Sequence, residues 1–177
     1  MHSTTPERTA GWLAPLLFAM LCAPAVQAQS AAPIELTAER AEVNQAEGVS
    51  TYRGNVVVTR GPMRMTGDVM VVHTDAQGQL ARLEMQGAPA TWRERRPGEP
   101  TRRAEAPRIV YYTADPERIV LSGGGRLWQG ENRVAGETIT HYPAEGRTIA
   151  DGDGTDGGRV SATVQPRSDA DAEAPSQ

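Results

Sequence analysis

The stretch that decides the fold is YRGNVVVTRG, residues 52–61. β-Branched side chains fill its centre and glycines interrupt it, a pattern typical of β-strands that meet at a corner. Three glycines of this region, Gly54, Gly61 and Gly67, recur 69 positions later (123 − 54, 130 − 61, 136 − 67) as Gly123, Gly130 and Gly136. Hydrophobic positions recur at the same offset, so the chain is predicted to contain two copies of a β unit.

Strand-like segments continue on both sides of residues 52–61. They are residues 33–36, 63–65, 69–72, 80–85, 108–112, 118–121, 126–128, 137–142 and 159–165. Turn residues separate them at short intervals, and no segment keeps a helical period for two turns. The composition agrees, since 18 glycines, 13 prolines and 5% aromatic residues in 177 residues argue against a helical bundle. We therefore predict an all-β domain of about ten or more short strands with almost no helix.

The two ends of this array are predicted to be open strand edges. Ile34 and Leu36 alternate with polar residues in the first strand, and Val160, Ala162 and Val164 alternate in the last. Neither strand has a proline in its interior, so end-to-end pairing with another strand is physically possible. Stacked β units of this kind permit end-to-end association by strand addition.

Residues 1–28 are predicted to be a secretory signal peptide that is cleaved after Ala28. The apolar run Leu13–Cys22 follows Arg8 and precedes the small residues Val26 and Ala28. An uncleaved anchor is the alternative, but the run of about ten residues is short of the roughly 20 that span a bilayer. Leu21 argues against lipid attachment at Cys22, and cleavage would remove the only cysteine, so the mature domain would contain no disulfide.

Two polar segments are predicted to lie outside the core. Arg93–Arg103 contains five arginines and reads as a long surface loop, either solvated or in contact with an anionic lipid headgroup or a partner protein. Residues 167–177 read as a disordered tail. All 18 basic residues are arginine, yet the net charge is −4. Because the chain is acidic overall and carries an export signal, we do not expect nucleic acid as a partner.

No catalytic or metal site is predicted. His73 and His141 are expected to be ordinary strand residues, without a nucleophile or carboxylate at a recognisable spacing. The segment Asp151–Gly157 looks superficially like a calcium loop, but Asp156 and Ala162 stand where an EF-hand needs Gly and Glu. We interpret it as an acidic turn, and we expect no enzyme activity and no cofactor.

Several short motifs, in this order, resemble the LptA family of periplasmic lipopolysaccharide-transport proteins. They are PIELTAE at 33–39, YRGNVVVTRG at 52–61, MTGD at 65–68, GAPATW at 87–92, VLSG at 120–123 and RVS at 159–161. The resemblance covers nearly all of residues 33–165 and departs from the family pattern at Gly67 and Gly124. It implies one domain, residues 29–166, with the fold of a V-shaped β-jellyroll whose hydrophobic interior takes the lipid A acyl chains of lipopolysaccharide.

The family's lipid-contacting positions correspond here to Ile34, Leu36, Trp92 and Tyr112. Strand alternation adds the residues expected to share a face with them. These are Tyr52, Val56, Val58, Met63, Met65, Leu83, Met85, Val110, Ile119, Leu121, Leu127, Val134 and Ile139. A register slip of one residue would turn this set inside out. We expect a charged residue at Leu36 or Trp92 to abolish lipid binding without unfolding the domain. We expect Val57→Glu, on the predicted outer face, to have a milder effect on lipid binding.

The resemblance also implies partners. They are lipopolysaccharide as cargo, an inner-membrane LptC-like protein at the N-terminal edge, an outer-membrane LptD-like translocon at the C-terminal edge, and further copies of the chain stacked head to tail. Two alternatives stay open on the sequence. One is a structural or adhesive repeat protein without lipid cargo, and the other is an LptC-like inner-membrane protein whose leader is not cleaved.

Overall fold

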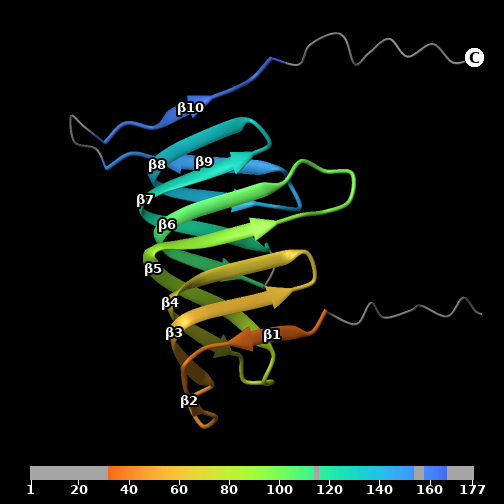
Figure 1. Ribbon diagram of the computed structural model, residues 1–177, viewed down its shortest axis with the longest axis vertical. Coiled ribbons are helices and arrows are strands. Elements are labelled where there is room, and N and C mark those ends of the chain that lie inside the picture. Colours follow the sequence, from red (N-terminus) through yellow and green to blue (C-terminus); the bar gives the residue numbers. More distant parts are fainter. Residues whose placement is uncertain (1–31, 114–115, 154–157, 167–177) are drawn as a thin grey trace, which may run out of the picture. The chain divides into compact units, whose positions relative to one another are not determined.

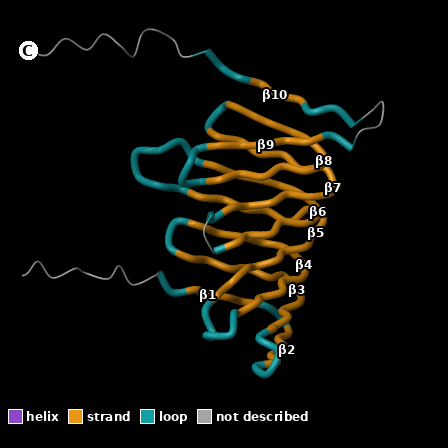
Figure 2. The backbone as a smooth tube through the Cα atoms, turned by 180° about the vertical axis from the view of Figure 1, so that it is seen from behind, coloured by secondary structure: helices purple, strands orange, loops and turns teal. Residues whose placement is uncertain are grey.

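The computed structural model describes residues 32–113, 116–153 and 158–166. The leader, part of the acidic turn and the C-terminal tail predicted from the sequence lie outside these residues. The strands are β1 (Ile34–Thr37), β2 (Arg40–Asn44), β3 (Val49–Arg60), β4 (Met63–Thr74), β5 (Leu80–Glu94), β6 (Arg102–Tyr112), β7 (Arg118–Gln129), β8 (Asn132–Tyr142), β9 (Arg147–Asp151) and β10 (Ser161–Thr163). The described residues contain no helix, so the all-β prediction is confirmed (Figure 2).

The ten described strands belong to one antiparallel sheet, in which consecutive strands from β2 to β9 are neighbours (Figure 1). The order is β1-β3-β4-β5-β6-β7-β8-β10, with β2 also pairing β3 and β9 also pairing β8. Each end of the sheet therefore has two short edge strands, β1 and β2 at one end and β9 and β10 at the other. Short edge strands leave few unpaired backbone groups, but these groups are free to pair with another chain.

A line of β-bulges crosses the middle of the long strands. The register shifts between Arg53 and Val56 in β3, and comparable shifts follow in every pair from β4–β5 to β7–β8. Bulges bend strands, so this line, here called the fold line, divides the sheet into two leaves. Leaf 1 comprises β2, residues 49–53, 69–74, 80–86, 108–112, 118–122 and 138–142, and β9. Leaf 2 comprises β1, residues 56–60, 63–66, 90–94, 102–105, 125–129 and 132–136, and β10.

The two copies of the β unit pair in the same register. Val58 lies opposite Met65 in the first copy, and Leu127 lies opposite Val134 in the second. Gly54 and Gly123 both have positive φ angles, 82° and 85°, at the equivalent bulge. A residue with a side chain rarely adopts this conformation, which explains why glycine recurs at these two positions.

The strands are longer than the sequence suggested, and β2 and β9 were missed. The segments 63–65 and 69–72 belong to the single strand β4, and β5 continues from Leu80 as far as Glu94. The last strand is shorter than 159–165, since β10 contains only Ser161–Thr163. The long surface loop predicted at Arg93–Arg103 is wrong at both ends, because Arg93 and Glu94 end β5 and Arg102 begins β6.

Candidate functional site: the interior between the two leaves

The inner faces of the two leaves form one apolar interior. Alternate side chains of β3 to β8 point into it, and their sizes are mixed, from alanine to tryptophan. The buried cluster consists of Val56, Val58, Met63, Met65, Met70, Leu83, Met85, Ala90, Trp92, Ala104, Ala106, Ile109, Tyr111, Ile119, Leu121, Leu127 and Ile139. Because both leaves contribute, burial of this cluster is what holds the leaves together.

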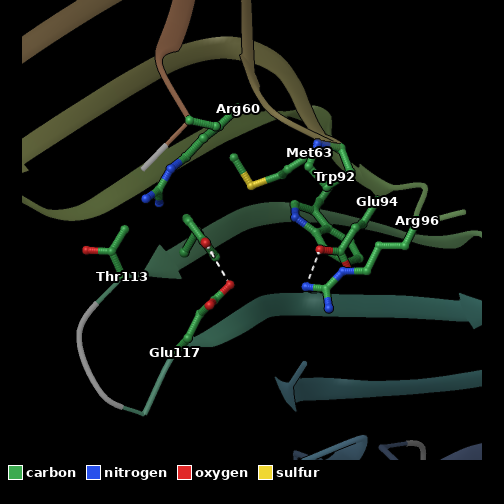
Figure 3. A pocket seen from close by; sticks show the side chains of 10 residues that line it. Arg60, Met63, Trp92, Glu94, Arg96, Thr113 and Glu117 are labelled. Carbon is green, nitrogen blue, oxygen red and sulfur yellow. Dashed lines mark hydrogen bonds and ion pairs between the residues drawn. The ribbon is translucent and has the colours of Figure 1, made fainter. Parts of the chain in front are cut away.

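The interior is filled in this structure. Met65, Met70, Leu83 and Met85 have no exposed surface, and they come from both leaves. A cavity of about 230 Å³ remains, which is smaller than the roughly 300 to 1,000 Å³ usual for small-molecule sites (Figure 3). The sequence left open whether the interior is a packed core or a trough, and the structure shows a packed core. Methionine is unbranched and adaptable, so this core is suited to repacking around a ligand.

The cavity lies at the side of the sheet opposite the fold line, where the turns of the two leaves meet. We call this side the mouth. Met63 and Trp92 line the cavity from leaf 2, and Tyr111 lines it from leaf 1 together with Glu117 from the following loop (Figure 3). The Tyr111 hydroxyl donates a hydrogen bond of 2.7 Å to Glu117 Oε1. Burial and then this carboxylate raise the pKa of Tyr111, so the hydroxyl remains a donor at neutral pH.

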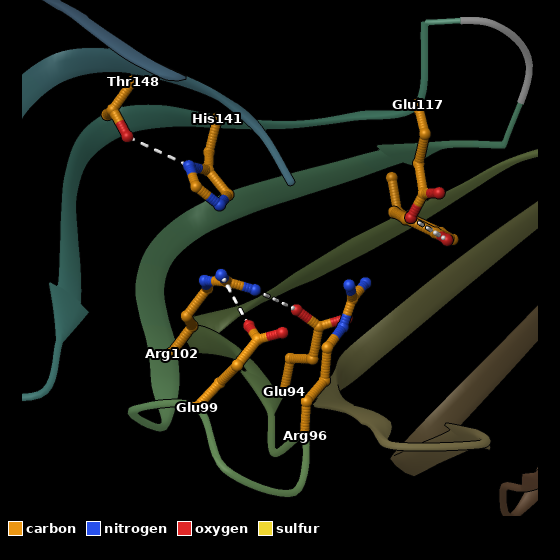
Figure 4. Close-up of polar contacts among 8 residues, drawn as sticks. Glu94, Arg96, Glu99, Arg102, Glu117, His141 and Thr148 are labelled. Atoms are coloured by element: carbon orange, nitrogen blue, oxygen red, sulfur yellow. Dashed lines mark hydrogen bonds and ion pairs between the residues drawn. The ribbon is translucent and has the colours of Figure 1, made fainter. Parts of the chain in front are cut away.

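A buried ion-pair network lies at the leaf 2 side of the mouth (Figure 4). Glu94 Oε1 is 2.9 Å from Arg96 Nη2, and Glu94 Oε2 is 3.0 Å from Arg102 Nη1. Arg102 Nη2 lies 2.8 Å from Glu99 Oε2. The predicted solvated arginine loop is therefore wrong for Arg102, whose guanidinium is largely buried and already paired with two carboxylates.

His141, which belongs to leaf 1, is also buried (Figure 4). His141 Nδ1 is 2.9 Å from Thr148 Oγ1, while His141 Nε2 has no hydrogen-bond partner among the described residues. Burial lowers the pKa of His141, and the nearby charge of Arg102 lowers it further, against a smaller opposing effect of Glu94. The sequence predicts an ordinary strand residue at this position, and no neighbouring residue in the chain indicates that the His141 side chain is buried.

His141 is expected to make stability depend on pH. Because its folded-state pKa lies below the ordinary 6.5, the unfolded chain takes up a proton that the folded chain does not. The stability contribution is complete above about pH 6.5 and is lost as the pH falls from there towards the lowered pKa. We expect the difference in Tm between pH 7.5 and 5.5 to be smaller in His141→Gln than in the wild type. An equally large change in His73→Gln, whose histidine is less buried, would contradict this assignment.

Comparison with known proteins decides the family. A family model described as "LptA/(LptD N-terminal domain) LPS transport protein" matches residues 35–147, which is more than half of the chain. The chain belongs to this family. It is a family of transport proteins and not of enzymes.

Relatives within the LptA family are similar over much of their length. The lipopolysaccharide export system protein LptH of Pseudomonas aeruginosa is 31% identical over 110 residues, which cover 62% of this chain and 62% of LptH. LptA of Escherichia coli K12 is 28% identical over 153 residues, covering 85% of this chain and 80% of LptA. The crystal structure of LptH, titled as the LptA-homologous periplasmic component of a lipopolysaccharide transport device, superposes with a TM-score of 0.69 at 27% identity. It covers 76% of this chain and 96% of that one.

Most of the residues expected to contact lipid lie on the interior face of this LptA-family fold. Buried in the cluster are Val56, Val58, Met63, Met65, Leu83, Met85, Trp92, Ile119, Leu121, Leu127 and Ile139. Leu36, Tyr52 and Val134 are partly buried and pack against it. Ile34 shares the face of Leu36 on β1 and is 40% exposed. Whether these side chains contact lipid remains a prediction.

The prediction that Val110 and Tyr112 face the interior is wrong. Both lie on the outer face, where Val110 pairs with Glu84 and Val120. The Tyr112 ring stacks on Arg118, whose guanidinium carbon is 4.0 Å from the ring centroid. The interior residues of this segment are Ile109 and Tyr111. The bulge between Glu105 and Arg108 shifts the alternation by one, so the residues predicted to face inward face outward instead.

The interior face is uncovered at both ends of the sheet. At the N-terminal end, Ile34 on β1 is 40% exposed and Val43 on β2 is 58% exposed. At the C-terminal end, Ala162 of β10 lies opposite Val134, and Val160 and Val164 share its face by alternation and are exposed. The apolar surface therefore continues to each edge, where no further strand of the described chain covers it.

The described residues include no cluster of three or more His, Cys, Asp or Glu side chains arranged to hold a metal ion. They also include no helix long and apolar enough to cross a membrane.

Proposed function

We propose that this protein is a periplasmic carrier that binds the acyl chains of lipopolysaccharide between its two leaves and passes the lipid from the inner towards the outer membrane. The observation that carries the proposal is the interior face, which is largely apolar from one end of the sheet to the other and exposed at both ends, in a chain of the LptA family. The named relatives, lipopolysaccharide export system proteins, support the same cargo.

The transfer needs no cofactor and no reaction. Each methylene group moved from water into the interior contributes about 0.8 kcal/mol, so acyl chains favour any similar interior over water. Passing from one copy to an identical copy leaves this free energy nearly unchanged. Direction must therefore come from an energy source outside this chain. Because the interior is filled, entry of an acyl chain requires the leaves to separate at the mouth and the methionines to repack.

The edge strands are the sites where we propose that partners bind. β1 and β2 would pair with an LptC-like inner-membrane protein or with the preceding copy, and β9 and β10 would pair with the next copy or with an LptD-like translocon. Such pairing would join the interior faces end to end, because the exposed apolar residues lie on these edge strands or directly beside them in the chain. Cleavage of the leader after Ala28 would release the chain into the periplasm.

Native mass spectrometry tests the carrier proposal. The protein is purified from the periplasm of a lipopolysaccharide-producing host, and bound lipid and oligomers are measured across a range of protein concentrations. We expect a bound lipid of lipopolysaccharide mass. Lipid-free protein under all conditions would favour the structural or adhesive alternative. N-terminal sequencing of the same sample distinguishes a cleaved carrier, which begins at Gln29, from an anchored LptC-like protein.

Stacking is tested at the N-terminal end by Val43→Asp. Val43 is exposed on the edge strand β2, so the change should not disturb folding. In a stack its carboxylate would be buried against the preceding copy, and we expect the association constant to fall roughly tenfold. Sedimentation equilibrium measures this constant. Gln77→Asp, which adds the same charge at an exposed turn, is the control, and equal weakening by both variants would contradict stacking through this end.

A further inference from the structure

A row of arginines crosses the outer face of leaf 2. Arg64 of β4 lies directly opposite Arg93 of β5, and Arg93 lies directly opposite Arg103 of β6. Trp128 of β7 follows in the same row, and Arg133 of β8 lies opposite it. Strands are about 4.8 Å apart, so the row from Arg64 to Arg133 is about 19 Å long. We call these four arginines the arginine row.

The arginine row runs beside the mouth. Each member is close to a turn of leaf 2, and its neighbours in sequence point inward: Met63 precedes Arg64, and Glu94 follows Arg93. The row is therefore the outermost line of outward-facing strand residues on this leaf, and it runs across the strands beside the turns of leaf 2. A group that projects from the mouth over leaf 2 would meet these side chains first.

No acidic side chain of the described residues neutralises the row. The four guanidinium groups are exposed, and none forms an ion pair with a described carboxylate. Their described contacts are with Trp128, whose ring centroid lies 4.7 Å from Arg103 and 5.8 Å from Arg133. Among the described residues, Glu35 of β1 continues the row beyond Thr59 and lies two strands from Arg64, and Glu105, opposite Arg126, is the carboxylate of the next row.

This arrangement opposes the stability of the sheet. Like charges directly opposite each other on adjacent strands are destabilising, and here Arg64, Arg93 and Arg103 occupy three successive strands. The protein as a whole carries a formal charge of −4, so the row is not a consequence of a generally basic surface. Planar guanidinium groups bind phosphate oxygens in pairs, and an array of them fits a ligand with several phosphates.

We propose that the arginine row binds the phosphate groups of the lipid's headgroup while the acyl chains lie between the leaves. The proposal rests on the carrier function proposed above and adds a second contact to it. The headgroup of a lipid held by its acyl chains must lie at the mouth, and the row is the cationic surface beside it. Because the arginines stand on successive strands, phosphates can exchange from one arginine to the next along the direction in which the strands are stacked.

The test compares two lipids and two variants. The lipids are lipid A with both phosphates and the same lipid A after removal of the phosphates, each dispersed in a neutral detergent. The row variant is Arg64→Gln/Arg93→Gln/Arg133→Gln, which retains the contact of Arg103 with Trp128. The control variant, Arg40→Gln/Arg53→Gln/Arg159→Gln, removes three exposed arginines elsewhere. Binding is measured by fluorescence titration at 50 and 300 mM salt.

The row variant is expected to bind phosphorylated lipid A roughly tenfold more weakly than the wild type at low salt, in line with three exposed ion pairs. The difference should shrink at high salt, since exposed charge interactions are screened. Binding of dephosphorylated lipid A should not change, and the control variant should bind both lipids as the wild type does. Because the substitutions remove repulsion, Tm should not fall.

Three results would overturn the proposal. Equal binding of phosphorylated lipid A by the row variant and the wild type would show that the row serves another partner, for example an acidic protein. Equal weakening for both lipids, or in both variants, would show that phosphate recognition is not involved. If the wild type bound neither lipid, the carrier function itself would fail and this inference with it, which is a distinct outcome from loss in the row variant alone.

Discussion

Leu36→Glu is expected to abolish co-purification of lipid while the domain remains folded. Leu36 lies on the interior face of the edge strand β1, opposite Val58, and is only partly buried. A carboxylate there can stay hydrated in the empty protein, so we expect a loss of stability of only about 1 kcal/mol. An acyl chain lying on β1 would remove this hydration, which costs several kcal/mol for a charged group. Native mass spectrometry measures the bound lipid, and circular dichroism measures Tm.

Val57→Glu is the matched control for Leu36→Glu. Val57 lies opposite Thr37 and Thr66, on the outer face of β3, between the interior residues Val56 and Val58. Its variant should retain bound lipid. If Val57→Glu lost the lipid and Leu36→Glu kept it, the interior would not be the binding surface. Trp92, which the sequence suggested as an equivalent test position, is unsuitable because it is 2% exposed within the buried cluster beside the mouth, and a charge there should unfold the domain.

Glu94→Gln is expected to cause a large loss of stability. Glu94 is 6% exposed and accepts hydrogen bonds from Arg96 and Arg102. The amide keeps the shape of the side chain but leaves the buried guanidinium of Arg102 paired only with the more exposed Glu99. Breaking one side of a buried ion pair costs about 3 kcal/mol, and in a domain of this size Tm should fall by roughly 10 °C.

A second substitution separates charge from packing in this network. Replacing both partners, Glu94→Leu/Arg102→Leu, removes the unpaired charge and should recover much of the stability lost in Glu94→Gln. Glu145→Gln breaks the exposed pair with Arg147 and should leave Tm unchanged within error, because both side chains are solvated. Thermal unfolding followed by circular dichroism compares the three variants. An unchanged Tm in Glu94→Gln would mean that the network does not stabilise the closed mouth.

The repeat and the interior face of β3 could be predicted because their signals are strong. Thr59 is polar and shares the face of Val57 by alternation, which places Val56 and Val58 on the opposite face. Four of the six recurring glycines, Gly54, Gly61, Gly123 and Gly130, have positive φ. The family could be inferred for the same reason, since motifs around these glycines keep a fixed order. In such segments local sequence and tertiary structure agree, and the alternation alone assigns each face.

The segment Ile109–Tyr112 could not be assigned correctly from its own residues. All four side chains are large and apolar, so either face of β6 satisfies the alternation, and only the bulge next to Pro107 decides between them. β2 and β9 were missed because each contains mostly polar residues and few apolar ones. The charged segment that contains Glu94 and Arg102 predicted a surface loop, because charged side chains are rarely buried unless they are paired. The sequence did not show that these two side chains pair with each other.

The fold line also determines how an opening of the leaves would be observed. The backbone ladder is already interrupted there, so the leaves can separate by bending at the bulges without breaking the ladders within each leaf. Amide hydrogen exchange should therefore report a rigid protein even while the interior is accessible. Solvent would reach the methionine sulfurs in the open state. Their oxidation by dilute peroxide would therefore reveal an opening motion that amide hydrogen exchange does not detect.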